Sequence, residues 1–390
     1  MFDLRSGTVN CPICKMETPV GKVVVIGSHV CSRQTCESCE TDFLCDLPTA
    51  HGTLFPNQLD AKTNILYGDV IAKSWFGIPL QEAWKTPNHK QVDVGVEKLT
   101  TAEDVVFVPC IDYYYGHAVL KLLSISGLLK GNASVIVLVP KWLRWLVPEG
   151  VAEIWTVDIP LRKGQNYFPS VSEQVCKELA RFNSVKLGEA RAHPDVGNPE
   201  EFTGVKKHSW DDEKFRISYI WRDDRLWVPE GILGKIFYRF PRLGRFVQKR
   251  RIVSIMKLLQ KAKLSNVKFT MITIGNSPKM PKWIDNQTFL PPLQKKSEQE
   301  LCRLYSESRV VIGIHGSNML LPSWHAGATF DLMPNDRWGN FGQDILFNEE
   351  NPRHAAIRYK FSPMSCSISN LAIQIYSIIR DYSVQRESFK

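Results

Sequence analysis

Four cysteines near the N-terminus have the type and the spacing of a metal site. They form two CxxC pairs with 21 residues between them, Cys11 with Cys14 and Cys36 with Cys39. Two such turns can each present two thiolates on one side, which predicts a closed, tetrahedral site for a structural Zn²⁺. Disulfides are the competing interpretation, and the lack of an apolar signal-peptide core disfavours them. Cys31 and Cys45 can either replace a ligand or serve as packing residues.

A second group is the short polar loop His315-Gly316-Ser317-Asn318. The β-branched run 309–314 predicts a buried strand before it, and apolar residues at helical spacing predict a helix over 319–325. We expect Ser317 or Asn318 to cap this helix and Gly316 to let a ligand approach the backbone. The free N–H groups of the first helical turn then favour a phosphate. A tight turn with a cap and no ligand is the competing interpretation.

The segment around this loop resembles a known family. Residues 310–334 follow the pattern VVIG-x-HG(S/A)-x(3)-L-P-x(4)-GAT-x-(D/E)-x(2)-P, which is similar to the C-terminal signature of family 61 glycosyltransferases. The resemblance is dense over this stretch and thin elsewhere. It implies the GT-B fold, in which two Rossmann-like α/β domains face a cleft, and transfer of a sugar from a nucleotide-activated donor. Ser317-Asn318-Met319 stands where the family more often has Ala-Gly-Leu, which leaves the donor sugar open.

Two arginines are candidates for binding the donor's diphosphate. The predicted strand 215–221 leads into Arg222 and Arg225. A guanidinium can bind two phosphate oxygens at once, which a lysine cannot do. The family has a similar arginine after the corresponding strand, so the resemblance implies a phosphate role for Arg222 and Arg225. Surface ion pairs with Asp223 or Asp224 are the competing interpretation.

Other strand ends add candidates at the same sheet edge. Gly275 and Asn276 end the predicted strand 267–274 with a small polar loop. Asp331 lies in the predicted strand 329–333, where its carboxylate can hold a ribose or sugar hydroxyl or can be a satisfied structural group. His315, the first residue of the polar loop, is a competing candidate for the base that accepts the acceptor's proton, but it suits better a hydrogen-bond donor to the diphosphate. The predicted donor site therefore comprises Arg222, Arg225, Gly275, Asn276, His315, Gly316, Ser317, Asn318 and Asp331.

An acid and a histidine follow a different predicted strand. The run Asp112-Tyr-Tyr-Tyr-Gly-His117 comes directly after the strand at 104–110 and opens a helix. An inverting transfer needs a base for the acceptor hydroxyl, and both His117 and Asp112 are of the right type. The family has a comparable N-Y-x-H element here. A structural histidine at a helix start is the competing interpretation. Because arginines can replace Mg²⁺ in stabilising a leaving diphosphate, we predict no catalytic metal.

The order of predicted elements divides the chain into three parts. Residues 1–50 form a zinc-ribbon-like module with a strand over 22–26, residues 51–205 an acceptor-side α/β domain, and residues 206–390 a donor-side α/β domain. Residues 183–210 carry Gly, Pro, Asp and Asn without periodicity and are predicted as the linker. Ser297 and Glu300 are predicted to form a capping box that starts a helix. The further elements predicted in the acceptor-side domain are strands at 134–139 and 151–157 and helices at 117–129 and 171–182.

The charge distribution limits the classes of partner. The net charge is +9, but 13 Lys and Arg and no Asp or Glu lie in 231–284, so the excess positive charge belongs to one segment. Residues 226–251 alternate apolar with basic side chains, which suits an interfacial helix on anionic lipid. A basic loop that packs its apolar residues on the domain is the alternative. The sequence contains no run of 18 apolar residues, so it predicts no membrane span.

These features together predict a cytoplasmic glycosyltransferase, peripheral at the inner membrane face. It would move a hexosyl or pentosyl group from a nucleotide-sugar to a glycan or lipid-linked acceptor in surface polysaccharide synthesis, by an inverting, metal-independent reaction. One alternative is a zinc-ribbon protein that binds nucleic acid through 231–284, which is less favoured because that segment lies inside the α/β region. Another is a catalytically inactive glycosyltransferase fold that serves as a scaffold.

Overall fold

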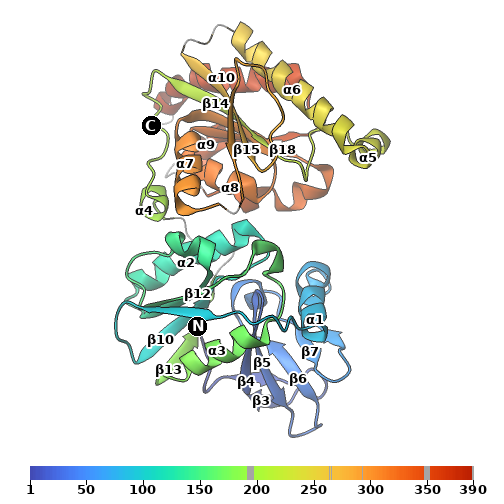
Figure 1. The fold of residues 1–390 in the computed structure, drawn as a ribbon, viewed down its shortest axis with the longest axis vertical. Coiled ribbons are helices and arrows are strands. Elements are labelled where there is room, and N and C mark those ends of the chain that lie inside the picture. Colours follow the sequence, from blue (N-terminus) through green and yellow to red (C-terminus); the bar gives the residue numbers. More distant parts are fainter. Residues whose placement is uncertain (191–196, 263, 265, 292, 347–351, 389–390) are drawn as a thin grey trace. The chain divides into compact units, whose positions relative to one another are not determined.

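The computed structural model describes residues 1–190, 197–262, 264, 266–291, 293–346 and 352–388. The chain divides into two compact units, Met1–Asp195 and Val196–Lys390 (Figure 1). Each unit contains a six-stranded sheet whose central strands are parallel. No helix in the described part of the chain is long and apolar enough to cross a bilayer. The predicted α/β class with largely parallel sheets is therefore confirmed in both units.

The sheet of the N-terminal unit has the order β1-β13-β10-β11-β12-β9. Its parallel strands are β10 (Asp104–Pro109), β11 (Val135–Pro140), β12 (Glu153–Val157) and β13 (Ser184–Leu187). Its antiparallel edges are β1 (Phe2–Asp3) and β9 (Val94–Lys98). The connecting helices are α2 (Tyr115–Lys130), η3 (Lys141–Leu146), η4 (Leu161–Lys163) and α3 (Pro169–Leu179). Taken in chain order, the parallel strands lie 4-1-2-3 across the sheet, so the direction of the order reverses between β10 and β13.

The predicted strands and helices of this unit are all present, but the predicted linker is partly wrong. β13 lies inside 183–210 and pairs with β10 along the register Val185↔Val105. Only Val185 and Leu187 of its four residues are buried, which is too short an alternation to identify a strand from sequence.

The cysteine-bearing segment is antiparallel β-structure that shares a core with this unit. It contains the hairpin β2 (Thr8–Asn10) and β3 (Glu17–Pro19) and a sheet of β4 (Lys22–Ile26), β5 (His29–Thr35), β6 (Asp42–Asp46), β7 (Gln58–Asp60) and β8 (Leu66–Tyr67). The helices are η1 (Ala50–Thr53), η2 (Lys73–Gly77) and α1 (Ile78–Lys85). Val25 of β4 packs in the same cluster as Ile136 and Trp155 of the parallel sheet, and its N–H donates to the Ser172 hydroxyl of α3 at 3.0 Å.

The sheet of the C-terminal unit is parallel throughout, in the order β16-β15-β14-β17-β18-β19. The strands are β14 (Phe215–Trp221), β15 (Val267–Ile274), β16 (Asp285–Phe289), β17 (Ser308–Ile314), β18 (Ala328–Met333) and β19 (Tyr359–Pro363). The helices are α4 (Pro199–Thr203), α5 (Ile232–Arg239), α6 (Pro241–Lys261), α7 (Lys295–Ser306), η5 (Ser317–Met319), α8 (Leu320–His325), η6 (Asn335–Asp344), α9 (Pro352–Arg358) and α10 (Ile368–Ser388). In chain order the strands lie 3-2-1-4-5-6, the Rossmann arrangement.

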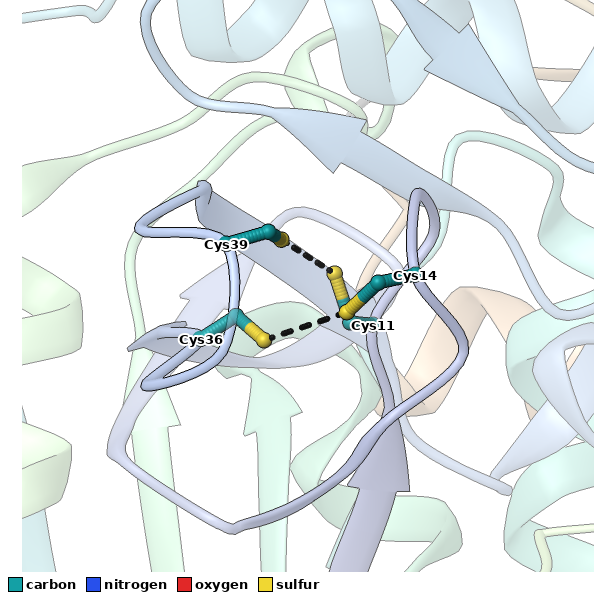
Figure 2. A group of neighbouring side chains, drawn as sticks. All are labelled: Cys11, Cys14, Cys36 and Cys39. Atoms are coloured by element: carbon teal, nitrogen blue, oxygen red, sulfur yellow. Dashed lines mark hydrogen bonds between the residues drawn. The ribbon is translucent and has the colours of Figure 1, made fainter.

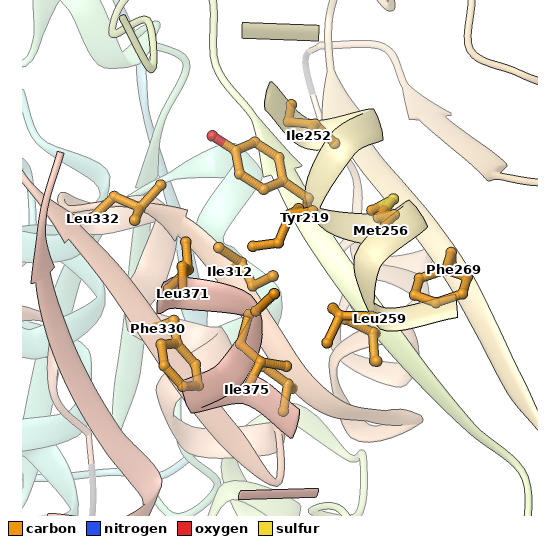
Figure 3. Close-up of a cluster of buried hydrophobic side chains, with 14 of the residues drawn as sticks. Tyr219, Ile252, Met256, Leu259, Phe269, Ile312, Phe330, Leu332, Leu371 and Ile375 are labelled. Atoms are coloured by element: carbon orange, nitrogen blue, oxygen red, sulfur yellow. The ribbon is translucent and has the colours of Figure 1, made fainter. Parts of the chain in front are cut away.

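Apolar side chains of α6 and α10 cover one face of this sheet (Figure 3). Met256 and Leu259 of α6 and Leu371 and Ile375 of α10 belong to one buried cluster with Tyr219, Ile312 and Phe330 of the strands. Helices α7 and α8 pack against each other outside this cluster. This buried cluster therefore supports the strands from whose carboxyl edge the site loops leave.

The predicted capping box is wrong. Helix α7 begins at Lys295, after Gln294 as its N-terminal cap, with no side-chain cap hydrogen bond. Lys295 and Lys296 already have helical geometry, so Ser297 lies inside the first turn and cannot cap it.

Candidate functional site

The strand order of the C-terminal sheet reverses between β14 and β17. These two strands pair in parallel, with Tyr219 opposite Ile312, so the chain leaves both at the same edge and side by side. β14 leads into Arg222 and Arg225, and β17 leads into His315-Gly316-Ser317-Asn318. In open α/β sheets, ligands bind in the crevice at such a switch point, outside the carboxyl ends of the strands.

Both arginines donate hydrogen bonds to this loop. The Arg225 Nη1 donates to the carbonyl oxygen of His315 at 2.6 Å, and the Arg222 Nη1 donates to the Oδ1 of Asn318 at 2.5 Å and to the His315 carbonyl at 3.4 Å. Burial, and then the charges of Arg222 and Arg337, lower the pKa of Arg225. The structure therefore gathers like charges at the switch point, which an anion would balance.

Gly316 makes this close contact possible. Its backbone has a φ of +145°, a conformation that residues other than glycine rarely adopt. A Cβ at this position would lie 2.5 Å from the Arg222 Nη1 and 3.4 Å from the Arg225 Nη1. The residue is thus required both for the backbone conformation and for the approach of the guanidinium groups.

Ion pairs with the neighbouring aspartates are also present. Arg222 donates two hydrogen bonds to the carboxylate of Asp224, and Arg245 pairs with Asp223 at 3.0 Å. The Asp224 side chain is 67% exposed, so its attraction is weakened by solvent. The Nε and Nη2 of Arg222 therefore face an exposed carboxylate, and its Nη1 faces the loop.

The side chain of His315 lies beside that of Asp331. The Nδ1 of His315 is 3.2 Å from the Oδ2 of Asp331, and both side chains are buried. Asp331 belongs to β18, which pairs with β17 so that Asp331 is opposite Gly313. A carboxylate beside Nδ1 fixes the imidazole's orientation. The backbone carbonyl of His315 accepts hydrogen bonds from both arginines.

The predicted helix cap is wrong. Neither Ser317 nor Asn318 makes a side-chain cap hydrogen bond, because the turn at 317–319 is a 3₁₀ turn that begins after Gly316. Asn318 instead accepts from Arg222. The helix α8 that follows has six residues, so its dipole is small and the positive charge at the loop comes from arginines.

Gly275 and Asn276 end β15 at the same sheet edge, on the side of β14 away from the loop. Gly275 has a φ of +100°, and its N–H donates to the carbonyl of Phe289 at the end of β16. Asn276 is exposed. These two residues add a second polar loop to the same sheet edge, next to the one that carries Arg222 and Arg225.

The switch point of the N-terminal sheet carries a different group. Asp112 follows β10, and its carboxylate lies 2.9 Å from the Nζ of Lys121 and 3.4 Å from the Nδ1 of His117. His117 and Lys121 are four residues apart on α2, so both reach the same carboxylate. Burial alone would raise the pKa of Asp112, but the Lys121 ammonium and His117 outweigh it and hold that pKa well below its usual range. Asp112 therefore stays charged and is a poor proton acceptor.

His51 is a member of this group that the sequence did not indicate. Its Nε2 lies 3.4 Å from the Nδ1 of His117, with the ring centroids 4.7 Å apart. The segment before His51 is held at the end of β13, because the Thr49 hydroxyl donates to the Gly188 carbonyl at 2.8 Å. His51 follows no motif and is 66 residues from His117, so only the fold brings them together. Lys121 was also missed, although its i+4 spacing from His117 was visible.

The four predicted ligand cysteines come together (Figure 2). Their sulfur atoms all lie within 4.8 Å of one another, with Cys11 to Cys39 and Cys14 to Cys36 both at 3.5 Å. Zn–S bonds of about 2.3 Å in a tetrahedron place sulfurs roughly 3.8 Å apart, so the group fits the ion. Hydrogen bonds from the hydroxyl and backbone of Thr41 lower the pKa of Cys39 to about 6, which favours the thiolate that binds metals. At Cys14, the Met16 backbone hydrogen bond lowers the pKa, but burial and the other three cysteine sulfurs outweigh it and raise the pKa to about 11, a crowding of thiols that a bound cation relieves.

The two cysteine turns have the same backbone geometry. In the first, Cys11 N–H donates to the Met16 carbonyl and Lys15 N–H donates to the Cys11 carbonyl. In the second, Cys36 and Glu40 donate in the same pattern, to Thr41 and Cys36. Lys15 and Glu40 both have positive φ angles, of 63° and 57°. Two equivalent turns thus face each other, as expected for paired metal-binding knuckles.

Cys31 and Cys45 lie outside this group. Cys31 packs with Val24 and Leu44 in a separate apolar cluster. Cys45 contacts Gln58, whose Nε2 donates to its sulfur at 3.4 Å, and burial raises the pKa of its thiol to about 11. Both behave as packing residues, which decides between the alternatives that the sequence left open.

Comparisons with known proteins give only distant structural likenesses. No protein-family model and no curated protein matches the chain. The ADP-heptose lps heptosyltransferase II of E. coli is 9% identical, covering 72% of this chain and 99% of its own, with a TM-score of 0.39. The S. aureus MnaA–UDP co-structure is 13% identical over 69% and 71% of the two chains (TM-score 0.30), and the spinosyn forosaminyltransferase SpnP is 11% identical over 72% and 68% (TM-score 0.25). At these values the likenesses assign this chain no activity.

Proposed function

We propose that this chain is a glycosyltransferase of the GT-B class that uses a nucleotide-activated sugar. The observation that carries the proposal is the pair Arg222 and Arg225, packed on Gly316 at the switch point of a 3-2-1-4-5-6 sheet. This is where a Rossmann-type sheet binds a nucleotide, and two guanidinium groups there suit the diphosphate of the donor.

In the reaction, the acceptor hydroxyl oxygen attacks the anomeric carbon of the donor while the bond from that carbon to the diphosphate oxygen breaks. Arg222 and Arg225 stabilise the negative charge that develops on the leaving diphosphate, without a catalytic metal. Attack from the face opposite the leaving group inverts the anomeric centre. The remaining donor-binding residues are Gly275, Asn276, His315, Ser317, Asn318 and Asp331.

His117 is the proposed base. Its Nδ1 lies beside the Asp112 carboxylate, so the Nδ1–H tautomer is favoured and Nε2 accepts the proton of the acceptor hydroxyl. Asp112, whose pKa is held well below its usual range, orients His117 and stabilises the imidazolium that forms. The acceptor is a glycan or a lipid-linked glycan, and we place the reaction in the cytoplasm, in surface polysaccharide synthesis.

Thermal shift with a panel of nucleoside diphosphates tests the donor site directly. Because a ligand that binds only the folded state stabilises it, a diphosphate at about 100 times its Kd should stabilise the chain by roughly 2.7 kcal/mol. Arg222→Ala should remove this shift, whereas Arg303→Ala should keep it, since Arg303 lies exposed on α7 and pairs with Glu300. A wild-type chain that no diphosphate stabilises would contradict the proposal.

A screen for hydrolysis of nucleotide-sugars then identifies the donor. Stabilisation by a diphosphate together with failure to hydrolyse or transfer any sugar would instead favour the catalytically inactive scaffold. Nucleic-acid binding by a zinc ribbon has less support, because the cysteine group belongs to the N-terminal unit and 231–284 to the C-terminal unit.

We further propose that Cys11, Cys14, Cys36 and Cys39 hold a structural Zn²⁺ that takes no part in transfer. All four positions are filled by thiolates, which leaves no coordination site for substrate. Metal analysis should find zinc in the purified chain, and Cys36→Ser should lose it together with several degrees of Tm. Cys366→Ser, at a cysteine outside the group, should retain the metal. Zinc content that survives Cys36→Ser would disprove this assignment.

A further inference from the structure

Helix α5 and the first half of α6 carry large apolar side chains that the protein does not cover. Across 231–246, only Gly234 and Gly244 are buried. Ile232 is 81% exposed, Phe240 56% and Phe246 53%. The other exposed apolar residues of this surface are Leu233, Ile236, Tyr238 and Leu243. By contrast, Ile252, Ile255, Met256 and Leu259 of the same α6 are buried in the core beneath it.

The two glycines explain why this face points outward. A Cβ on Gly234 would lie 2.6 Å from the Pro229 carbonyl oxygen, and one on Gly244 would lie 2.5 Å from a methyl group of Leu226. Across residues 231–246 the chain therefore contacts the rest of the unit most closely through its smallest residues. At roughly 100° per residue, Ile232, Ile236 and Phe240 fall in one stripe, well away from Gly234. The sequence alternative, a basic loop that packs its apolar residues on the domain, holds for Leu226, Trp227 and Val228, which are buried, but not for residues 231–246.

The charged residues of this surface are almost all basic. Lys235, Arg239, Arg242, Arg245 and Arg250 are exposed among the apolar residues, and no Asp or Glu occurs between residues 231 and 284. One of these cations has an acidic partner from outside the segment, since Arg245 pairs with Asp223. Arg250 lies over the ring of Phe246, at 5.7 Å from its centroid.

A surface of this kind needs a partner that offers both an apolar region and negative charge. A second copy of the chain would bring two basic surfaces face to face, which like-charge repulsion disfavours. A nucleic acid would satisfy the cations and leave the apolar side chains in water. The interface of an anionic bilayer satisfies both, because apolar side chains enter the acyl boundary while Lys and Arg contact lipid phosphates.

We propose that α5 and residues 241–250 of α6 lie on the surface of an anionic phospholipid membrane. Neither helix crosses it, in keeping with the lack of a bilayer-spanning helix in the described part of the chain. The inference is independent of the transfer reaction, because it requires none of the residues proposed to bind donor or accept a proton.

Co-sedimentation with vesicles tests this docking on the full chain. The wild type should bind vesicles of phosphatidylglycerol mixed with phosphatidylcholine, should not bind phosphatidylcholine alone, and should be released by high salt. Ile232→Ser with Phe240→Ser, and separately Lys235→Glu with Arg239→Glu, should each lower the bound fraction at least tenfold. Because the four side chains are exposed, both variants should keep the wild-type Tm and the nucleotide-dependent thermal shift.

Val70→Ser with Ile71→Ser is the matched control. These residues are 87% and 77% exposed in the N-terminal unit, so the control removes similar apolar surface elsewhere and should bind like the wild type. Equal binding to neutral vesicles, or wild-type binding by either α5 variant, would overturn the proposal. So would a dimer in light scattering that the same substitutions dissociate, or binding to nucleic acid but not to vesicles.

Discussion

The two sheet switch points have the same place in the topology and opposite chemistry. In the N-terminal unit the strand order reverses between β10 and β13, and a buried carboxylate there is matched by a buried ammonium, Asp112 with Lys121. In the C-terminal unit it reverses between β14 and β17, and Arg222 and Arg225 both contact the His315 carbonyl. The first group is close to neutral and the second carries excess positive charge.

This difference in charge gives the two switch points different chemical properties, and the proposed function assigns them different roles. A neutral, internally paired cluster can hold an imidazole in a fixed orientation without attracting ions. At the second point Arg222 pairs with the exposed Asp224, and the excess positive charge of Arg222 and Arg225 attracts an anion before any chemistry occurs. We therefore expect substitutions at the first point to affect turnover and stability, and substitutions at the second to affect nucleotide affinity.

The largest expected effect is the loss of turnover on substitution of His117, at the switch point of the N-terminal sheet. His117→Ala should lower kcat by about 10²–10⁴-fold, because it removes the general base, while leaving the nucleoside diphosphate Kd unchanged. His89→Ala, at an exposed histidine of the same unit, should have wild-type kcat. Steady-state kinetics and calorimetric titration separate the two constants. A variant that loses diphosphate affinity and keeps kcat would reverse the assignment of the two points.

The next effect is on stability. Asp112→Asn should cost about 3–5 kcal/mol at pH 7, because it leaves the buried Lys121 ammonium without its carboxylate. The pKa of Asp112 is lowered in the folded chain, so the unfolded chain binds more protons in acid. The stabilisation is thus present above the ordinary value of 3.8 and is lost as the pH falls through the lowered pKa.

Thermal unfolding of wild type and Asp112→Asn between pH 3 and 7 measures this linkage. The difference in Tm should be largest near neutral pH and should shrink below pH 4. A difference that does not change with pH would show that the carboxylate's charge is not what stabilises this region.

The sequence predicted the local parts of these sites better than the contacts between them. The CxxC spacing and the strand-loop-helix around His315 are local patterns, and the structure has both. The role of Asn318 was not predictable from its own loop, since its side chain accepts from Arg222, 96 residues away, instead of capping the helix. His51 was missed for the same reason: its partner is distant in sequence, and nothing in its neighbourhood indicates a histidine pair.

A smaller effect is expected where backbone geometry supports the C-terminal point. Gly316→Ala should raise the diphosphate Kd by about 10–100-fold, because a Cβ would displace the Arg222 guanidinium and strain a backbone with positive φ. Gly339→Ala is the matched control, because its Cβ would meet open space. Calorimetric titration measures both. If Gly316→Ala binds diphosphate like the wild type, the arginines do not need their contact with the loop.

The smallest effect is expected from a substitution that keeps the positive charge and changes only the geometry of its hydrogen-bond donors. Arg225→Lys preserves a cation near the His315 carbonyl but loses the planar fork that can hold two phosphate oxygens. We expect a rise in Kd of about 3–10-fold, against the larger loss for Arg222→Ala, because one charge-assisted hydrogen bond contributes about 1.5–3 kcal/mol and a lysine replaces part of it. Titrations at low and high salt should show wild-type salt dependence, since the number of charges is unchanged. A loss as large as that of Arg222→Ala would mean that hydrogen-bond geometry, and not net charge, defines the C-terminal point.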